Sequence, residues 1–370
     1  MLAQIHFQKR ALILPLVAIS FGLGSCNTAT TDTPVGGASP DGTSTPAASA
    51  PSGSSSGTLS LTGAGATFPA PLYQRWFAEY NKVKPDVQIS YQSVGSGAGV
   101  EQFSKGTVDF GASDTAMKDE EIAKVSKGVV LLPMTAGSIV LAYNLPEVQG
   151  LKLPRAVYGD IFLGKIKTWD DPAIAKANPG AKLPKLPIQV VYRSDGSGTT
   201  GVFTKHLSAV SPDFKTKVGD GKTVQWPVGK GAKGNEGVTA EIQQTQGGIG
   251  YIEYGYAKQN NIAMASLENK AGKFIESTPE SASKTLASIK LPENLRAFAP
   301  DPEGADSYPI VSYTWMLAYK DYGDVKKSQA IKDMVKWGLT DGQKLSAELG
   351  YVPLPPEVSA KVETAVQTIK

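Results

Sequence analysis

The chain has 370 residues, of which 41% are apolar and 19% charged, an ordinary composition for soluble protein and a length sufficient for two hydrophobic cores. The formal charge of +3 at pH 7 includes Lys9 and Arg10 near the N-terminus, and no stretch is basic enough to indicate a nucleic-acid partner. Cys26 is the single cysteine, so an intrachain disulfide is excluded.

Residues 1–25 are predicted to be a signal peptide. Lys9 and Arg10 precede the apolar run 11–23, which is too short to span a bilayer comfortably and is typical of a signal-peptide core. Small residues then precede Cys26 in a pattern that resembles a bacterial lipobox, which implies a cleaved leader and a lipid on Cys26. A buried or free thiol is the alternative, and the position of Cys26 before a tract that cannot form a core argues against it.

Residues 26–57 are predicted to be a flexible tether that begins with the lipidated cysteine. Almost every residue after Cys26 is Ser, Thr, Gly, Pro or Ala, none is aromatic, and only Asp32 and Asp41 are charged. Such a segment cannot bury enough surface to offset its ordering entropy. The sequence at 53–57 matches the Gly-x-Ser-x-Gly elbow of hydrolases, but no strand is expected before it and no helix after it, so it is assigned no catalytic role.

The folded part is expected to begin near Thr58 and to alternate strands with helices. Apolar side chains recur at helical spacing after the first two strands, and again at 330–339 in an amphipathic helix. The alternation predicts an α/β fold with mostly parallel sheets, in which ligands bind at the carboxyl ends of the strands. The predicted strands cover residues 59–61, 87–91, 108–114, 138–143, 188–192 and 310–319.

Residues 193–199 follow one of these strands and have the character of an anion-binding turn. A helix is expected to begin here, so its first N–H groups lack partners within the helix and lie at the positive end of its dipole. Glycines at 196 and 198 let the backbone approach a ligand, and Arg193 adds a planar fork of donors. The alternative is an ordinary N-capped helix, with Arg193 paired to Asp195 at the surface.

Two further glycine-rich turns, at 62–67 and 94–99, carry Ser or Thr and lead into predicted helices, and the strand 108–114 ends in Asp114. One such turn is weak evidence, but three of them with a carboxylate nearby favour a shared ligand site over packing alone. The glycine-rich loop 229–237 lacks the spacing of a Walker A loop and is predicted to be a turn that starts a helix, with contact to the ligand's surroundings left open.

The residue types needed for catalysis are missing. After the leader the chain has one histidine, His206, which is expected to be a packed or surface residue, not a base. No His, Cys and Asp cluster has metal-ligand spacing, and no nucleophile has an evident base as partner. We therefore expect a protein that is not an enzyme and that needs no metal and no cofactor.

Five motifs, in order and at similar spacing, resemble the phosphate-binding protein of the bacterial high-affinity phosphate ABC importer. The resemblance runs from about Leu59 to the end of the chain. The motifs lie at residues 62–71, 108–114, 193–199, 233–237 and 248–254.

This resemblance implies a two-lobed periplasmic binding protein, each lobe a mostly parallel sheet flanked by helices, with the ligand clamped between the lobes. Lobe I would comprise residues 58–135 and 313–370 and lobe II residues 136–312, with 138–143 and 310–319 near the crossovers. It also implies phosphate binding outside the cytoplasmic membrane, delivery to the membrane subunits of an ABC permease, anchoring through Cys26 and a monomeric state.

Carried over by motif position, the resemblance implies eight phosphate ligands, and Asp195 would hold the guanidinium of Arg193. Family members often have a second Ser after the position of Ser96, where this chain has Gly97. The implied ligands are Thr67, the Phe68 N–H, Ser96, Asp114, Arg193, Ser197, the Gly198 N–H and Thr199.

A carboxylate in an anion site has a physical reason. Phosphate near neutral pH retains a proton that Asp114 can accept, whereas sulfate has none, so an unpaired carboxylate facing sulfate would be costly. The alternative role for Asp114 is a helix N-cap. The alternative functions for the chain are binding of another oxyanion and a lipid-anchored phosphate sensor.

Overall fold

The computed structural model describes residues 57–370, and Ser55–Lys370 form one compact unit. The predictions for the signal peptide, Cys26 and nearly all of the tether lie outside the described residues. Among those that are described, no helix combines the length and apolar character needed to cross a membrane.

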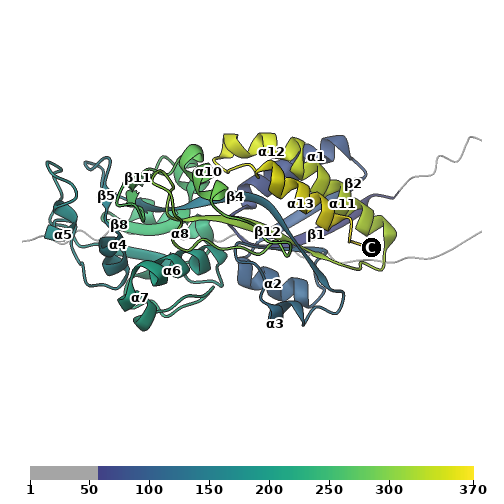
Figure 1. Cartoon of the computed structure of the whole chain (residues 1–370), viewed down its shortest axis with the longest axis horizontal. Coiled ribbons are helices and arrows are strands. Elements are labelled where there is room, and N and C mark those ends of the chain that lie inside the picture. Colours follow the sequence, from purple (N-terminus) through teal and green to yellow (C-terminus); the bar gives the residue numbers. More distant parts are fainter. Residues whose placement is uncertain (1–56) are drawn as a thin grey trace, which may run out of the picture. The chain divides into compact units, whose positions relative to one another are not determined.

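One nine-stranded sheet organises the fold, with strand order β2-β1-β3-β12-β4-β8-β6-β7 and β9 paired to β4 (Figure 1). Its long central strands, β4 and β12, are buried almost throughout. The strands are β1 (Leu59–Gly65), β2 (Val87–Ser93), β3 (Phe110–Ser113), β4 (Val129–Tyr143), β6 (Gln189–Arg193), β7 (Lys230–Ala232), β8 (Gly248–Glu253), β9 (Ala263–Met264) and β12 (Val311–Tyr319).

The strand directions divide the sheet into outer and central parts. The outer strands are parallel, β1 with β2 and β3, and β6 with β7 and β8, as the alternation of strands and helices predicts. The central strands β4 and β12 run antiparallel to each other and to their neighbours. Residues 129–138 of β4 pair with β12 and residues 139–143 with β8, so β4 passes from one end of the sheet to the other.

Helices cover both ends of the sheet, and we call the two groups of elements lobe I and lobe II. Lobe I contains β1–β3, α1 (Ala70–Val83), α2 (Ser96–Ser104), α3 (Asp119–Ile122), α11 (Val325–Leu339), α12 (Asp341–Ser346), the 3-10 turn Ala347–Leu349 and α13 (Pro356–Val366). Lobe II contains β6–β8, α4 (Arg155–Phe162), α5 (Pro172–Ala175), α6 (Gly198–Val210), α7 (Pro212–Lys217), α8 (Gly234–Gln244), α9 (Tyr254–Gln259) and α10 (Pro279–Ala287). A second, small sheet of lobe II has the order β11-β10-β5, from Phe274–Ile275, Ser266–Glu268 and Lys152–Leu153.

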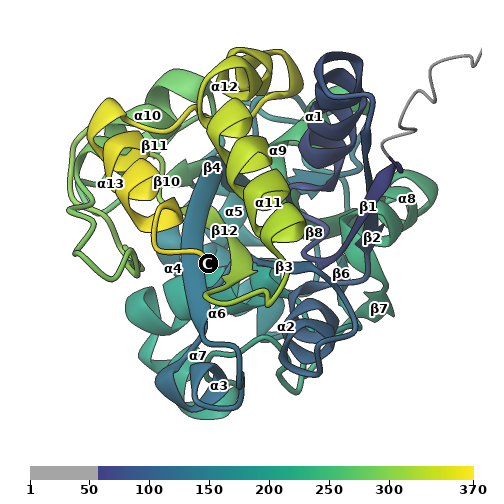
Figure 2. The same ribbon diagram turned by 90° about the vertical axis from the view of Figure 1, so that its right-hand side faces the viewer.

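Apolar side chains at helical spacing hold the helices to the sheet. The α1 face predicted from Leu72, Trp76, Phe77 and Tyr80 is buried, and α1 packs beside α11 and α12 over lobe I (Figure 2). The predicted helix at 330–339 is the larger part of α11. This packing supports the lobe I strands, and polar residues lie just after the carboxyl ends of β1 and β3.

Candidate functional site

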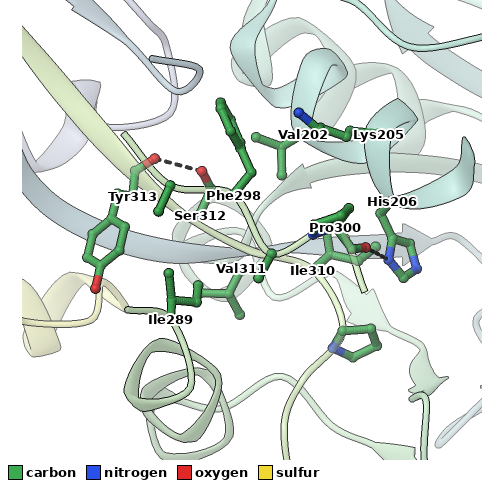
Figure 3. A pocket seen from close by; sticks show the side chains of 13 residues that line it. Val202, Lys205, His206, Ile289, Phe298, Pro300, Ile310, Val311, Ser312 and Tyr313 are labelled. Atoms are coloured by element: carbon green, nitrogen blue, oxygen red, sulfur yellow. Dashed lines mark hydrogen bonds between the residues drawn. The ribbon is translucent and has the colours of Figure 1, made fainter. Parts of the chain in front are cut away.

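A small cavity lies between α6 and residues 297–313, and none of the predicted phosphate ligands lines it (Figure 3). Its volume of about 10 Å³ has room for about one water molecule. His206, at its edge, is buried, with Nδ1 2.6 Å from the Pro300 carbonyl and Nε2 2.7 Å from the Tyr158 hydroxyl. A carbonyl can only accept, so Nδ1 donates, and burial lowers the pKa of His206 to about 4. His206 is thus a packed, neutral histidine, as predicted.

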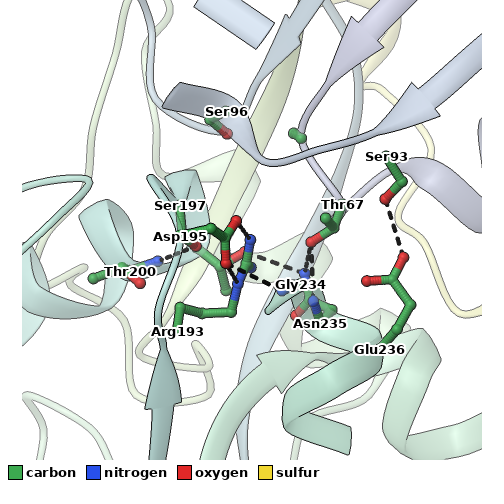
Figure 4. Close-up of polar contacts among 12 residues, drawn as sticks. Thr67, Ser93, Ser96, Arg193, Asp195, Ser197, Thr200, Gly234, Asn235 and Glu236 are labelled. Carbon is green, nitrogen blue, oxygen red and sulfur yellow. Dashed lines mark hydrogen bonds and ion pairs between the residues drawn. The ribbon is translucent and has the colours of Figure 1, made fainter. Parts of the chain in front are cut away.

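The structure brings the residues predicted from separate motifs together in one buried place. Thr67 follows β1, Ser96 opens α2 and Asp114 follows β3, all in lobe I; Arg193 ends β6 and Thr199 lies in the first turn of α6, both in lobe II. None of these five residues is more than 4% exposed. Figure 4 shows three of them, Thr67, Ser96 and Arg193. Within lobe I the parallel strands β1 and β3 end side by side, whereas β6 runs in the opposite direction, because three antiparallel pairings through β12, β4 and β8 separate it from β3. The carboxyl ends of the two sets of strands therefore face each other where the lobes meet.

Glycine allows the turns of the two lobes to touch. The Gly97 N–H donates to the Gly196 carbonyl at 2.7 Å. A Cβ at Gly198 would lie only 2.4 Å from the Ser96 Oγ and 2.8 Å from the Asp114 Cβ, so a side chain there would force the lobes apart. A Cβ at Gly97 would also be tight, at 3.0 Å from the Gly196 Cα, which is a physical reason for glycine at this position.

Arg193 and Asp195 form a bidentate ion pair within lobe II. The Arg193 Nε donates to Asp195 Oδ1 at 2.7 Å and Nη2 donates to Oδ2 at 2.5 Å. The Gly234 N–H, at the start of α8, also donates to Oδ1 at 3.1 Å. Burial alone would raise the pKa of Asp195, but the guanidinium and this N–H lower it below its usual value. The surface pairing considered from the sequence is therefore wrong, because the Arg193 side chain is only 1% exposed.

Asp114 has a different environment. Its Oδ1 accepts from the Thr314 hydroxyl at 3.0 Å and its Oδ2 from the Thr199 hydroxyl at 3.3 Å. Burial raises its pKa to about 7, although Thr314, the nearby charge of Arg193 and Thr199 all oppose the increase. The N-cap role is excluded, since the next helix begins at Asp119. Asp114 is a buried carboxyl group that can exchange a proton near neutral pH.

The hydroxyl groups of the site share one arrangement, in which each accepts a hydrogen bond from the protein. Ser96 Oγ accepts from the Asp114 N–H at 3.3 Å, and Ser197 Oγ accepts from the Thr200 N–H at 3.0 Å. Thr199 Oγ1 accepts from Arg193 Nη1 at 3.4 Å. A hydroxyl whose oxygen already accepts still has its proton to donate, so Ser96 and Ser197 are set to bind an acceptor, whereas the Thr199 proton is directed at Asp114.

Hydrogen bonds to the carbonyl groups of Thr67 and Phe68 also hold the backbone at the site in place. The Tyr256 hydroxyl donates to the Thr67 carbonyl at 2.7 Å, and the Tyr351 hydroxyl donates to the Phe68 carbonyl at 2.6 Å. Within residues 57–370, neither the Thr67 N–H nor the Phe68 N–H donates to a protein acceptor. The Gly198 N–H is in the first turn of α6 and has no acceptor within that helix.

Two residues at the site were missed from the sequence. Asn235, in the first turn of α8, donates through Nδ2 to Thr67 Oγ1 at 2.7 Å; the glycine-rich loop 229–237 was the signal, but contact with the site was left open. Thr314 donates to Asp114 from the buried strand β12, where a hydroxyl among apolar residues was an available signal. No group of three or more His, Cys, Asp or Glu side chains among the described residues is arranged to hold a metal ion.

Comparison with known proteins agrees with this geometry. A family model described as a PBP superfamily domain matches residues 45–341. The chain is 45% identical over 312 residues to the phosphate-binding protein PstS of Pasteurella multocida, a match that covers 83% of this chain and 90% of that protein.

Solved structures match the fold. A high-affinity periplasmic phosphate-binding protein, PfluDING, solved with bound phosphate, has a TM-score of 0.69 at 21% identity, over 83% of this chain and 93% of that one. A phosphate-binding protein from Stenotrophomonas maltophilia has a TM-score of 0.66 at 19% identity, with the same coverage of 83% and 93%. At these identities the likeness establishes the fold, and the predicted two-lobed α/β architecture is confirmed.

Proposed function

The chain belongs to the PstS family of phosphate-binding proteins, and from this premise we propose that it binds inorganic phosphate with high affinity outside the cytoplasmic membrane and delivers it to an ABC-type permease. One observation carries the proposal. A buried guanidinium, hydroxyl groups that already accept a hydrogen bond, and backbone N–H groups converge on one place together with the Asp114 carboxyl group, whose pKa is raised.

Each part of this set matches a property of phosphate. Oxyanion oxygens are acceptors, so N–H and O–H donors satisfy them, and Arg193 supplies the charge. Phosphate near neutral pH keeps at least one proton, and Asp114 is the acceptor for it. We propose that phosphate is bound by Thr67, Phe68, Ser96, Asp114, Arg193, Ser197, Gly198 and Thr199, while Asp195 fixes the guanidinium.

The ligand is held where the lobes meet, so release requires that the lobes separate. The contacts that join lobe I to lobe II around the site include Gly97 to Gly196, Ser93 Oγ to Glu236 Oε1 at 3.0 Å, and Lys222 Nζ to Glu121 Oε1 at 2.7 Å. β4 and β12 connect the lobes and act as the hinge. In this proposal lobe I comprises residues 58–135 and 313–370 and lobe II residues 136–312.

Binding without catalysis is part of the proposal. Calorimetric titration with phosphate, arsenate and sulfate tests it: phosphate and arsenate, which both keep a proton near pH 7, should bind, and sulfate should bind far more weakly. A phosphate ester assay on the same preparation should give no turnover. Sulfate binding as tight as phosphate binding would make this a binding protein for another oxyanion.

Lipid anchoring through Cys26 is the proposed means of keeping the protein, a monomer, at the membrane. Mass spectrometry of the protein from its native host should show a diacylglyceryl-modified Cys26 at the mature N-terminus. Cys26→Ser should lose the lipid and leave the membrane fraction. An unmodified Cys26 in the mature wild-type protein would contradict this part of the proposal.

A further inference from the structure

We infer that Asn235 is a positioning residue that turns the Thr67 hydroxyl proton toward the bound phosphate. The inference rests on the proposed function and concerns a residue outside the eight proposed ligands. Asn235 is fully buried, lies in the first turn of α8 in lobe II, and faces Thr67 of lobe I (Figure 4).

The Thr67 hydroxyl accepts two hydrogen bonds, both from Asn235. Its Oγ1 is 2.7 Å from Asn235 Nδ2 and 3.1 Å from the Asn235 backbone nitrogen, and both groups donate. A hydroxyl oxygen has two lone pairs and one proton. With both lone pairs used by one residue, the remaining interaction of the Thr67 hydroxyl is donation of its proton. The hydroxyl is then a donor only, which suits a ligand whose oxygens accept.

A hydrogen bond at the other end of the amide fixes the orientation of the Asn235 side chain. Its Oδ1 accepts from the Glu253 N–H at 2.9 Å, at the end of β8. Because a backbone N–H can only donate, the amide oxygen must face Glu253 and the NH₂ group must face Thr67. The start of α8 and the end of β8 therefore fix the amide before any ligand is bound.

The Asn235 amide also lies near a hydroxyl group of its own lobe, that of Thr199. Asn235 Nδ2 also lies 3.4 Å from Thr199 Oγ1, which is itself 3.4 Å from Arg193 Nη1. These two contacts are long, so we assign the main effect to Thr67. Since Thr67 belongs to lobe I and Asn235 to lobe II, the donor array is complete only when the lobes are together. The amide thus links lobe closure to hydroxyl orientation.

A double-mutant cycle tests the inference on the full chain, freed of bound phosphate by exhaustive dialysis. The dissociation constant for inorganic phosphate is measured for wild type, Asn235→Ala, Thr67→Val and the double variant. We expect Asn235→Ala to weaken binding roughly 10- to 100-fold in wild type, the range for a lost buried hydrogen bond. In the Thr67→Val background the same change should have a much smaller effect, about threefold or less.

Asn269 provides a matched control, because it has a structural role but no contact with the site. It is also a buried asparagine of lobe II, and its Nδ2 donates to the carbonyls of Gly304, Ala305 and Ser307, not to the site. Asn269→Ala should lower the unfolding temperature and leave the phosphate dissociation constant within about twofold of wild type. An equal loss of binding in Asn269→Ala and Asn235→Ala would overturn the inference.

Asn235→Asp gives a second measurement if the alanine variant does not fold. It keeps the size of the side chain but replaces the amide donor with an acceptor, so the Thr67 proton should turn to the carboxylate and binding should weaken more than in Asn235→Ala. Phosphate binding like that of wild type in Asn235→Asp, or equal effects of Asn235→Ala with and without Thr67, would contradict the inference. A wild-type protein that does not bind phosphate would instead contradict the proposed function.

Discussion

The two lobes each place one aspartate at the site, a buried Asp114 and a partly buried Asp195, and the two differ in charge state. In lobe II, Asp195 is committed to the Arg193 guanidinium by two hydrogen bonds, which lower its pKa. In lobe I, Asp114 accepts from hydroxyls alone, and burial raises its pKa to about 7. Both burial and the partner differ: Asp114 is fully buried among hydroxyl groups, whereas Asp195 is partly buried and paired with a guanidinium, which keeps its charge.

This difference gives the lobes separate tasks. Lobe II supplies a fixed positive group whose charge is offset by Asp195, so the ion pair holds the guanidinium in place for an oxyanion. Lobe I supplies a group whose protonation can follow that of the ligand. In the proposed site, an anion that carries a proton satisfies both lobes when Asp114 is ionised, while an anion without one then satisfies lobe II alone.

Removal of the lobe II cation should have the largest effect. Arg193→Ala leaves Asp195 without its partner and Asp114 without the nearby charge, and breaking a buried ion pair in this way typically costs about 3–5 kcal/mol. We expect phosphate binding, measured by calorimetry, to weaken at least 100-fold. Arg193→Lys should recover only part of the loss, because an ammonium group cannot form the same fork. Binding within threefold of wild type in Arg193→Ala would place the guanidinium away from the ligand.

The lobe I carboxyl should be visible in the pH dependence of stability. Its pKa of about 7 in the folded protein lies above the ~3.9 of an unfolded aspartate, so the folded state keeps a proton that the unfolded chain releases. The stability that this residue contributes is present below about pH 4 and is lost as the pH rises to about 7. We expect Asp114→Asn to remove this dependence, changing the slope of the unfolding free energy by up to about 1.4 kcal/mol per pH unit.

Chemical denaturation of phosphate-free protein at pH 5, 6 and 7 measures that slope. His206 contributes with the opposite sign, since its lowered pKa of about 4 gives stability that is lost as the pH falls below about 6.5. Both proteins contain His206, so its contribution cancels in the difference. Equal slopes for wild type and Asp114→Asn would mean that Asp114 is charged in the folded state at all three pH values.

The smallest effect is expected for loss of the ion pair between Lys222 and Glu121, which joins the lobes at the rim of the site, away from the buried donors. The Lys222–Glu121 pair is 21% and 25% exposed, so Lys222→Ala should weaken phosphate binding by less than about 1 kcal/mol, and less still at high salt. Lys270→Ala, which removes the exposed Lys270–Glu303 pair within lobe II, is the control and should not change binding. A large, salt-independent loss in Lys222→Ala would mean that the rim, not the buried donors, controls affinity.

The local parts of the fold could be predicted from the sequence, and the pairing of distant strands could not. The strands at the start of the chain and the helix with Trp76 follow from local apolar periodicity. The antiparallel pairing of Val311 with Ser138 joins segments far apart in the chain, and no local pattern encodes it. Strands of two or three residues, such as β5 and β9, are too short to show a period.

The contacts of the site also divide into those between near neighbours in the sequence, which could be predicted, and those between distant residues, which could not. The pairing of Asp195 with Arg193 follows from their separation of two residues, although its burial does not. Thr314 and Asn235 act through contacts with residues at least 168 positions away, so neither position can be assigned from its neighbours in the sequence. Only the structure shows that one helix start, at Gly234 and Asn235, holds both Asp195 and Thr67.

The most direct test of the account is the ratio of the sulfate to the phosphate dissociation constant in wild type and in Asp114→Asn. The ratio is measured by calorimetry at one salt concentration and at about pH 8, above the Asp114 pKa of about 7, so that the carboxyl group is ionised while phosphate still carries a proton. In wild type, sulfate leaves the Asp114 carboxylate facing an oxygen that has no proton to give; in the variant, the amide can donate to that oxygen. We predict that the ratio falls at least tenfold in Asp114→Asn, while phosphate binding weakens only modestly because the amide oxygen still accepts the phosphate proton. An unchanged ratio would contradict the account, since selectivity would then come from another part of the site.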